Sequence, residues 1–261
     1  MRLTLPCLHA QHADAPERFI DSEVDLHEEV KRLGSLAAAP ELYPELVRLG
    51  AVPSLLALLT HENADIAAEG ATLLRELTDA DAAAESDAAL AGAAALAEAI
   101  AGPADDADAA DDDAAAPAAS GLPAIVAAMG RFDETQPEEA AAVHALLNVC
   151  ENLIEVSPVL RERLMAPPTG LLAALLERVT ARGAVDANKV YAAELLSVLL
   201  AGGDAAAAAL GDAGGVDALL RAIAPHKRLG AAKGATALPE DEEERVRPVM
   251  NMLSNWLLLV N

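Results

Sequence analysis

Polar residues that could bind a peptide recur at helical spacing in two segments of the chain. Carboxylates can pair with Lys and Arg side chains, and an amide can donate and accept hydrogen bonds at once, as a peptide backbone requires. The candidates are Glu69, Thr72, Glu76, His144, Asn148, Glu151 and Asn152, with Asn255 in the place analogous to Asn148. Because residues three and four apart share one face of a helix, the spacing predicts a polar face in each segment.

Catalytic or metal-binding residues form no comparable pattern. The six histidines are scattered in unrelated contexts, so no nucleophile, base and stabilising group are expected to converge. Cys7, His9 and His12 lack a fourth ligand, and Cys150 lies on an apolar helix face, where a thiol behaves as a small hydrophobe. The stretch 230–236 (GAAKGAT) lacks the residue order of a phosphate-binding loop and follows no strand. We therefore expect no enzyme activity, no metal and no cofactor.

The net charge narrows the class of partner. The chain has 18 Lys and Arg against 42 Asp and Glu, a formal net charge of −24. This charge repels nucleic acids and anionic membranes, so neither is an expected partner, whereas basic protein segments are attracted.

Two cysteines indicate no disulfide framework, and the first residues lack a signal-peptide core. No run approaches the roughly 20 apolar residues of a membrane span. The sequence predicts a soluble, intracellular, protein-binding chain.

An internal repeat organises the chain. The segment GAVPSLLALL (50–59) aligns without gaps with SGLPAIVAAM (120–129), and more loosely with segments that start at Thr169 and Gly214. The later starts are 49 and 45 residues apart, close to the roughly 40 to 47 residues of armadillo and HEAT repeats. Small residues at each start suit a tight turn, and the apolar helix that follows needs neighbours to cover it. The pattern predicts an all-α, armadillo/HEAT-like right-handed solenoid of about four stacked repeats.

A second, amphipathic helix follows each apolar one. Its predicted apolar face is formed by Ile66, Leu73, Leu74 and Leu77 in the first copy, and by Val143, Leu146, Leu147, Cys150 and Leu153 in the second. Residues 187–200 form the third such helix and 245–260 the fourth. An earlier helix is predicted over 25–39, ends at Pro40 and resumes over 41–49. Stacked side by side, the second helices would line the concave surface by which solenoids bind partners.

Three stretches are expected to depart from the repeat. Residues 1–15 are predicted to be an irregular N-terminus before the solenoid domain, which spans 16–261. The Ala/Asp tract 101–119 has two prolines and no large apolar side chain, so we expect a disordered acidic loop, which also lengthens the first interval to 70 residues. The chain stops at the apolar stretch 256–261 without a polar capping element. This predicts a solenoid that is incomplete at its C-terminus and that self-associates through the open end.

Several sequence blocks are specific enough to compare with a known family. They are 16–30 (PERFIDSEVDLHEEV), 41–66, 76–81 (ELTDAD), 186–196 (DANKVYAAELL) and the pairs at 143–144, 151–152 and 227–228. Taken in their order along the chain, these blocks resemble the beta-catenin-like family of nuclear armadillo proteins. The resemblance implies a nuclear, non-catalytic protein of the spliceosome's nineteen complex that grips basic localisation segments of splicing partners. Compared with that family, an N-terminal extension and the C-terminal half are missing, and the acidic insert is extra.

Two motifs within these copies leave alternatives open. Asn148, in ALLNV (145–149), resembles the ALxN signature by which armadillo grooves present an asparagine to a ligand's backbone, but a helix-stacking or solvated role is equally open. Glu76 and Ser197 replace it in other copies. Asp186 is expected to cap the helix that begins after it. Lys189 and Tyr191 could instead mark a partner surface.

Two other classes of armadillo protein are alternatives. One is a co-chaperone that promotes nucleotide exchange. The other is an import receptor, which needs repeated WxxxN steps, whereas Trp256 is followed by Val260 at the fourth place. The family blocks favour a splicing-associated scaffold over both classes.

Overall fold

Helices are the regular elements throughout the described part of the chain. A computed structural model describes residues 16–102, 121–182, 185–232, 247 and 250–251. These residues contain no strand, which confirms the predicted all-α fold. None of the helices described is long and apolar enough to cross a membrane. The predicted N-terminal irregular segment, the acidic tract beyond Gly102 and the apolar end at 256–261 lie outside the described residues.

The chain divides into two compact units, Met1–Ser157 (the first unit) and Pro158–Asn261 (the second unit). The first unit contains α2 (Pro16–Leu33), the 3-10 segments η1 (Gly34–Ala38) and η2 (Pro40–Leu42), α3 (Tyr43–Arg48), α4 (Ala51–Leu58), α5 (Ala64–Leu77), α6 (Ala80–Ala83), α7 (Asp87–Ala101), α8 (Leu122–Met129) and α9 (Pro137–Val156). The second contains α10 (Leu160–Met165), η3 (Pro167–Thr169), α11 (Leu171–Thr180), α12 (Ala187–Leu200), α13 (Asp204–Asp212) and α14 (Gly215–Ala232). The single domain expected over 16–261 stays a prediction.

Each repeat contains three helices, one more than the sequence pattern indicates. The repeats are α3–α4–α5, α7–α8–α9 and α10–α11–α12, and α13–α14 begins the next. The sequence predicts the apolar helix after each turn and the amphipathic helix that follows. It also predicts a helix over 41–49, which contains α3, but it does not predict α7 or α10. The fold is an all-α solenoid of the armadillo type with about four repeats, as predicted. Its right-handed sense stays a prediction.

A glycine with positive φ begins the second helix of each repeat. Gly50, Gly121, Gly170 and Gly214 have φ values of 69°, 78°, 77° and 66°. The first three are the N-caps of α4, α8 and α11. A residue with a Cβ adopts this backbone conformation at a cost, which explains the small residue at each repeat start. The predicted tight turns are confirmed.

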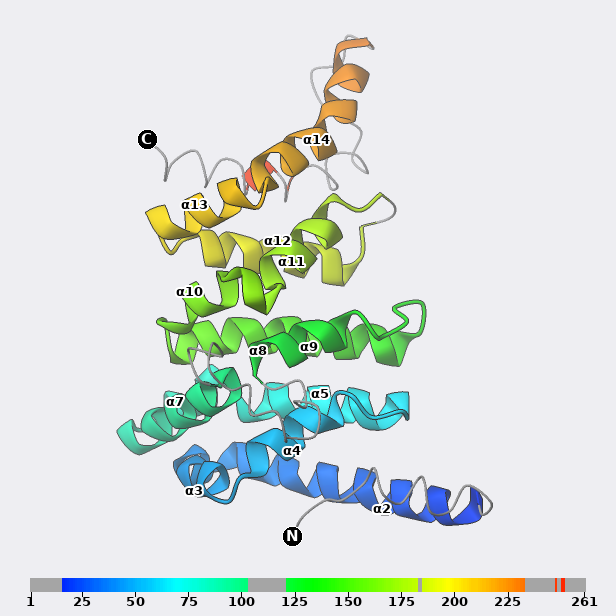
Figure 1. Cartoon of the computed structure of the whole chain (residues 1–261), viewed down its shortest axis with the longest axis vertical. Coiled ribbons are helices and arrows are strands. Elements are labelled where there is room, and N and C mark those ends of the chain that lie inside the picture. The colour runs from blue at the N-terminus through cyan, green and yellow to red at the C-terminus, as the bar shows by residue number, and fades with distance from the viewer. Residues whose placement is uncertain (1–15, 103–120, 183–184, 233–246, 248–249, 252–261) are drawn as a thin grey trace, which may run out of the picture. The chain divides into compact units, whose positions relative to one another are not determined.

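The three helices α2, α5 and α9 form successive layers in the first unit (Figure 1). Asn63, just before α5, donates from Nδ2 to Glu23 Oε2 of α2 at 3.0 Å. At the opposite end, a Cβ placed on Gly34, just after α2, would lie 3.0 Å from Glu76 Oε2 near the end of α5. The start of α5 therefore lies beside the middle of α2, and the two helices end close together, so α2 and α5 run in the same direction.

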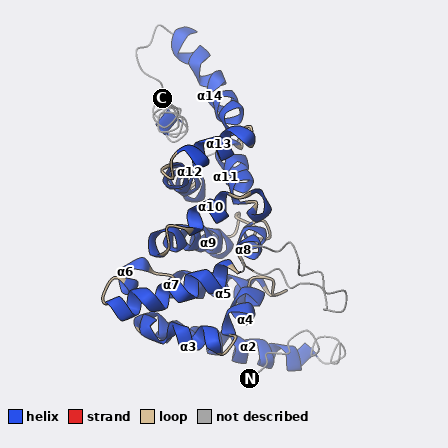
Figure 2. Ribbon diagram, turned by 60° about the vertical axis from the view of Figure 1, so that its left-hand side comes forward, coloured by secondary structure: helices blue, strands red, loops and turns tan. Residues whose placement is uncertain are grey.

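The helices α5 and α9 are parallel for the same reason. Arg131, which precedes α9, donates to the carbonyl oxygens of Leu59 at 2.8 Å and His61 at 3.1 Å, which precede α5. Asn152, near the end of α9, contacts the last turn of α5. Arg131 thus satisfies carbonyl groups at the end of α4, which would otherwise lack intrahelical partners. The first helices of these repeats also stack, as Figure 2 shows for α3 and α7.

The core consists of the predicted apolar faces together with alanine. Every residue predicted for the apolar faces of α5 and α9 is buried, with at most 2% of its surface exposed. The expected helix over 25–39 differs from the structure, where α2 begins at Pro16 and ends at Leu33. The 3-10 segment η1 then runs from Gly34 to Ala38, between Gly34 and Pro40, both of which disfavour a continuous α-helix.

Candidate functional site

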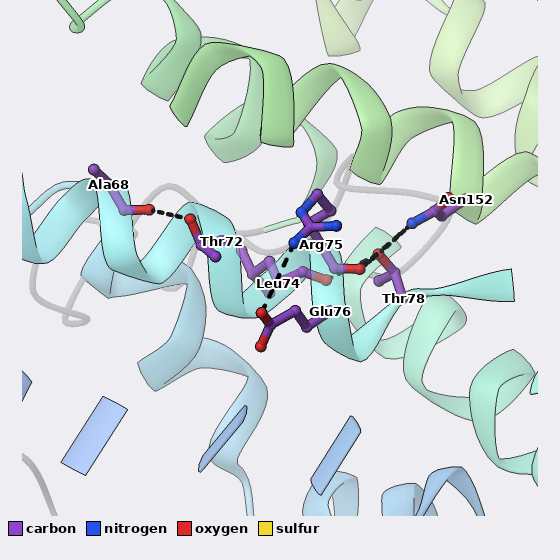
Figure 3. Close-up of polar contacts among 7 residues, drawn as sticks. All are labelled: Ala68, Thr72, Leu74, Arg75, Glu76, Thr78 and Asn152. Atoms are coloured by element: carbon purple, nitrogen blue, oxygen red, sulfur yellow. Dashed lines mark hydrogen bonds and ion pairs between the residues drawn. The ribbon is translucent and has the colours of Figure 1, made fainter. Parts of the chain in front are cut away.

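The candidate residues of α5 are partly exposed and share one face. Glu69, Thr72 and Glu76 are all intermediate in burial, while the opposite face of α5 is covered. The Thr72 hydroxyl donates to the Ala68 carbonyl oxygen of its own helix at 3.1 Å, so it presents an oxygen that can still accept (Figure 3). These three residues form the α5 half of the predicted polar face.

The candidate residues of α9 lie on the neighbouring parallel helix. His144 is exposed, and Asn148 and Glu151 are intermediate in burial. Because α5 and α9 pack side by side in the same direction, we expect the two rows of polar residues to belong to one surface of the first unit. We call this surface the α5/α9 face. Asn255, the remaining candidate, lies outside the described residues.

Asn152 departs from the expected placement on the open face. It is only 8% exposed, and its Nδ2 donates to the Arg75 carbonyl oxygen at 3.4 Å and to Thr78 Oγ1 at 3.3 Å (Figure 3). Thr78 Oγ1 in turn donates to the Leu74 carbonyl oxygen at 2.8 Å. The Asn152 amide therefore joins α9 to the last turn of α5, and its side chain is covered by that contact.

The Asn152 contacts predict a measurable loss of stability. Asn152→Ala should lower the free energy of unfolding by about 1 kcal/mol, the usual net worth of a hydrogen bond. Asn152→Asp should lower it further, because a carboxylate cannot donate to the Arg75 carbonyl and is costly to bury. Urea unfolding followed by circular dichroism measures both. The partly exposed Asn148→Ala is the matched control and should change stability little; equal losses in all three variants would contradict this role.

Glu76 already has a cationic neighbour that the sequence did not single out. Arg75 Nη2 lies 3.8 Å from Glu76 Oε1, and the two side chains are 38% and 41% exposed. An ion pair this exposed contributes little to stability because solvent screens it. A basic ligand could therefore displace Arg75 from Glu76 at little cost.

Further carboxylates extend the α5/α9 face at the carboxyl ends of the two helices. Burial raises the pKa of Glu155, and the charges of Glu151, Asp81 and Asp79 raise it further. These like charges therefore repel one another and favour a bound cation or a cationic side chain over empty solvent. Glu155 follows Glu151 by four residues and so lies on the same side of α9, but the sequence does not reveal that Asp79 and Asp81 approach it.

The negative charge is concentrated in the first unit. Residues 1–157 contain 30 of the 42 Asp and Glu residues but only 7 of the 18 Lys and Arg. Residues 158–261 hold the remaining 12 acidic and 11 basic residues, which nearly balance. The first unit, which carries the α5/α9 face, therefore has a strongly negative formal charge, whereas the second unit is nearly neutral.

Two residues of the segment 186–191 (DANKVY), in the second unit, have a structural role. Asp186 Oδ1 accepts a hydrogen bond from the Lys189 backbone N–H at 2.8 Å, which confirms the predicted N-cap of α12. Lys189 donates from Nζ to the Ala181 carbonyl oxygen, the C-cap of α11, at 2.6 Å. Together they fix the junction between consecutive helices. Tyr191 is intermediate in burial, and its suggested partner role stays a prediction.

No alternative chemistry is assembled in the described residues. That part of the chain contains no group of three or more His, Cys, Asp or Glu placed to hold a metal ion. The candidate ligands Cys7, His9 and His12 lie outside it, as does most of the stretch 230–236. Cys150 is fully buried, and this burial raises the pKa of its thiol to about 12, so little of the reactive thiolate forms near neutral pH.

Comparison with known proteins places these features in a family. A family model described as catenin-beta-like, Arm-motif containing, nuclear matches residues 7–260. Beta-catenin-like protein 1 of Bos taurus and of Homo sapiens are each 34% identical to the chain over 252 residues, which is 97% of this chain and 40% of each relative. The Beta-catenin-like protein 1 homolog of Schizosaccharomyces pombe is 30% identical over 252 residues, 94% of this chain and 39% of the relative. The chain thus spans about 40% of the length of the curated relatives it matches.

Proposed function

The chain belongs to the catenin-beta-like family of Arm-motif-containing nuclear proteins, and from this premise we propose that it is a nuclear, non-catalytic scaffold that binds basic segments of splicing proteins. The ligands would be localisation-type segments of partners in the spliceosome's nineteen complex. The α5/α9 face would hold them. The concentration of negative charge in the first unit is the observation that supports this proposal most.

The chemistry of the face suits an extended basic peptide. Glu69, Glu76 and Glu151 offer carboxylates to Lys and Arg side chains, and the Asn148 amide can pair with the peptide backbone. Burial raises the pKa of Glu155 most, and the neighbouring negative charges raise it further; a cationic ligand would relieve this second contribution. A peptide held by these groups would contact them mainly through exposed charges, so salt should weaken binding.

The test is calorimetric titration of a Lys- and Arg-rich peptide across a salt series. The Debye length falls from about 10 Å at 0.1 M to about 3 Å at 1 M salt, so we expect affinity to fall steeply over this range. Glu76→Lys combined with Glu151→Lys should weaken binding at least about tenfold at 0.1 M, or about 1.4 kcal/mol. Asn148→Ala should cost less, about 1 kcal/mol for a neutral hydrogen bond.

A matched control variant shows whether binding depends on the α5/α9 face or only on the net charge of the chain. Glu41→Lys combined with Glu85→Lys changes the net charge equally, at exposed positions on η2 and just before α7. It should retain most of the affinity at 0.1 M salt. Equal loss in both double variants, or binding that salt does not change, would reject the α5/α9 face as the site.

Affinity purification from nuclear extract tests the splicing assignment separately. We expect the wild-type chain to recover splicing factors and the Glu76→Lys, Glu151→Lys variant to lose them. Recovery of a chaperone ATPase in their place would favour the co-chaperone alternative. Loss of splicing factors without loss of basic-peptide binding would show that peptide binding is real but serves another partner.

A further inference from the structure

A cavity of about 190 Å³ lies between α10 and α13 in the second unit. Met165 and Pro167 line it from one side, and Gly202, Ala205 and Ala206 line it from the other. Apolar cavities of about 150 Å³ bind molecules the size of benzene, so this space fits a Leu or Phe side chain. The small residues before and within α13 leave it open, because larger side chains at these positions would fill it.

A cationic group with an unsatisfied donor stands in the wall of this cavity. The stem of Arg161 packs against Gly202, where an added Cβ would lie 2.6 Å from Arg161 Cδ. Arg161 Nε is buried without a hydrogen-bond partner, and among the described residues it is the one buried side-chain nitrogen or oxygen in that state. A buried donor without an acceptor is destabilising, so Arg161 is a charged group whose hydrogen-bonding capacity is not used up within the second unit.

A carboxylate is the acceptor that best matches this group. It accepts charge-assisted hydrogen bonds from guanidinium N–H groups, which are stronger than bonds between neutral groups. The second unit is nearly neutral in formal charge, unlike the acidic first unit, so it does not repel an acidic ligand at long range. An apolar cavity beside an unpaired guanidinium therefore selects an apolar group that carries a nearby carboxylate.

We propose that the α10/α13 cavity binds a protein segment in which a Leu- or Phe-sized side chain is flanked by acidic residues. The apolar side chain would enter the cavity and a neighbouring carboxylate would pair with Arg161. This site is distinct from the α5/α9 face and selects a ligand of opposite charge. Glu162, the acidic residue of the lining, is exposed and would oppose the ligand's carboxylate.

Methyl NMR on the full chain can test the site with short peptides. The probes are a capped Asp-Leu-Asp peptide, the neutral capped Asn-Leu-Asn peptide and free 4-methylpentanoate, titrated into protein labelled with carbon-13 at its methionine methyl groups. Met165 lines the cavity and should shift on binding, while Met129, in the first unit, is the internal reference and should not. We expect the acidic peptide to bind at least tenfold more tightly than the neutral one.

Three variants test the cavity and the guanidinium separately. Ala206→Leu should fill the cavity and abolish the Met165 shift, and Arg161→Met should keep the stem but remove the preference for the acidic peptide. Glu162→Gln should strengthen binding of the acidic peptide about two- to threefold. Equal affinity of the two peptides, or an unchanged Met165 titration in Ala206→Leu, would overturn the proposal. Tighter binding of 4-methylpentanoate than of the acidic peptide would overturn the assignment to a protein segment.

Discussion

Gly92→Ala should destabilise the first unit by roughly 1–3 kcal/mol, although alanine is normally the better residue in a helix. Gly92 lies within α7, where an added Cβ would be 2.0 Å from the Pro40 carbonyl oxygen and 2.9 Å from its carbonyl carbon. The Glu41 Cα would be 3.3 Å away. All three atoms are backbone, so no side chain can rotate to make room. Either α7 or η2 must move, and their packing would be lost.

Gly211→Ala is the matched control for this prediction. Gly211 also lies in a helix, α13, but a Cβ there would meet nothing within 4 Å. The substitution should therefore raise stability by up to about 1 kcal/mol, from helix propensity and the smaller entropy of the unfolded chain. Urea unfolding monitored at 222 nm compares the two variants with the wild type. A Gly92→Ala protein as stable as Gly211→Ala would show that α7 and η2 do not pack this closely.

The predictable part of the fold is the part with large apolar residues at regular spacing. The second and third helices of each repeat, and the glycine turns before them, follow from such patterns in α4, α5, α8 and α9. Among the first helices, α3 lies within the helix predicted over 41–49, whereas α7 and α10 gave no comparable signal. α10 has only six residues, and α7 is mostly alanine, so the residues around Gly92 show almost no contrast in hydrophobicity between the helix faces.

The candidate site shows a second limit of sequence patterns. The spacing of a single helix predicts which residues share a face, but not where a neighbouring helix covers that face. Asn152 follows Asn148 by about one turn, yet it is covered by the last turn of α5, whereas Asn148 stays partly exposed. Arg131 and Lys189 were also unpredictable as caps, because each reaches carbonyl groups of another helix through a long side chain.

Two buried groups should make the protein lose stability at alkaline pH. Burial raises the pKa of the Cys150 thiol to about 12. Burial also raises the pKa of the Tyr43 hydroxyl to about 12, with smaller contributions from the charges of Asp79 and Glu41. In the unfolded chain these groups lose their protons near pH 8.5 and 10. The stability that each group contributes is therefore fully present below its pKa in the unfolded chain. It is lost as the pH rises toward 12, because the unfolded state releases its protons first.

Cys150→Ala should reduce this alkaline loss, which isolates the thiol's contribution. Between pH 9 and 11 the wild type should lose about 2 kcal/mol more of its free energy of unfolding than the variant, from a slope of about 1.4 kcal/mol per pH unit and group. The variant should be less stable at neutral pH, because it leaves a small cavity in the fully buried face of α9. That offset does not depend on pH, so urea unfolding at several pH values separates the two effects. Parallel stability curves for the two proteins would show that the thiol is not shielded from solvent as the structure requires.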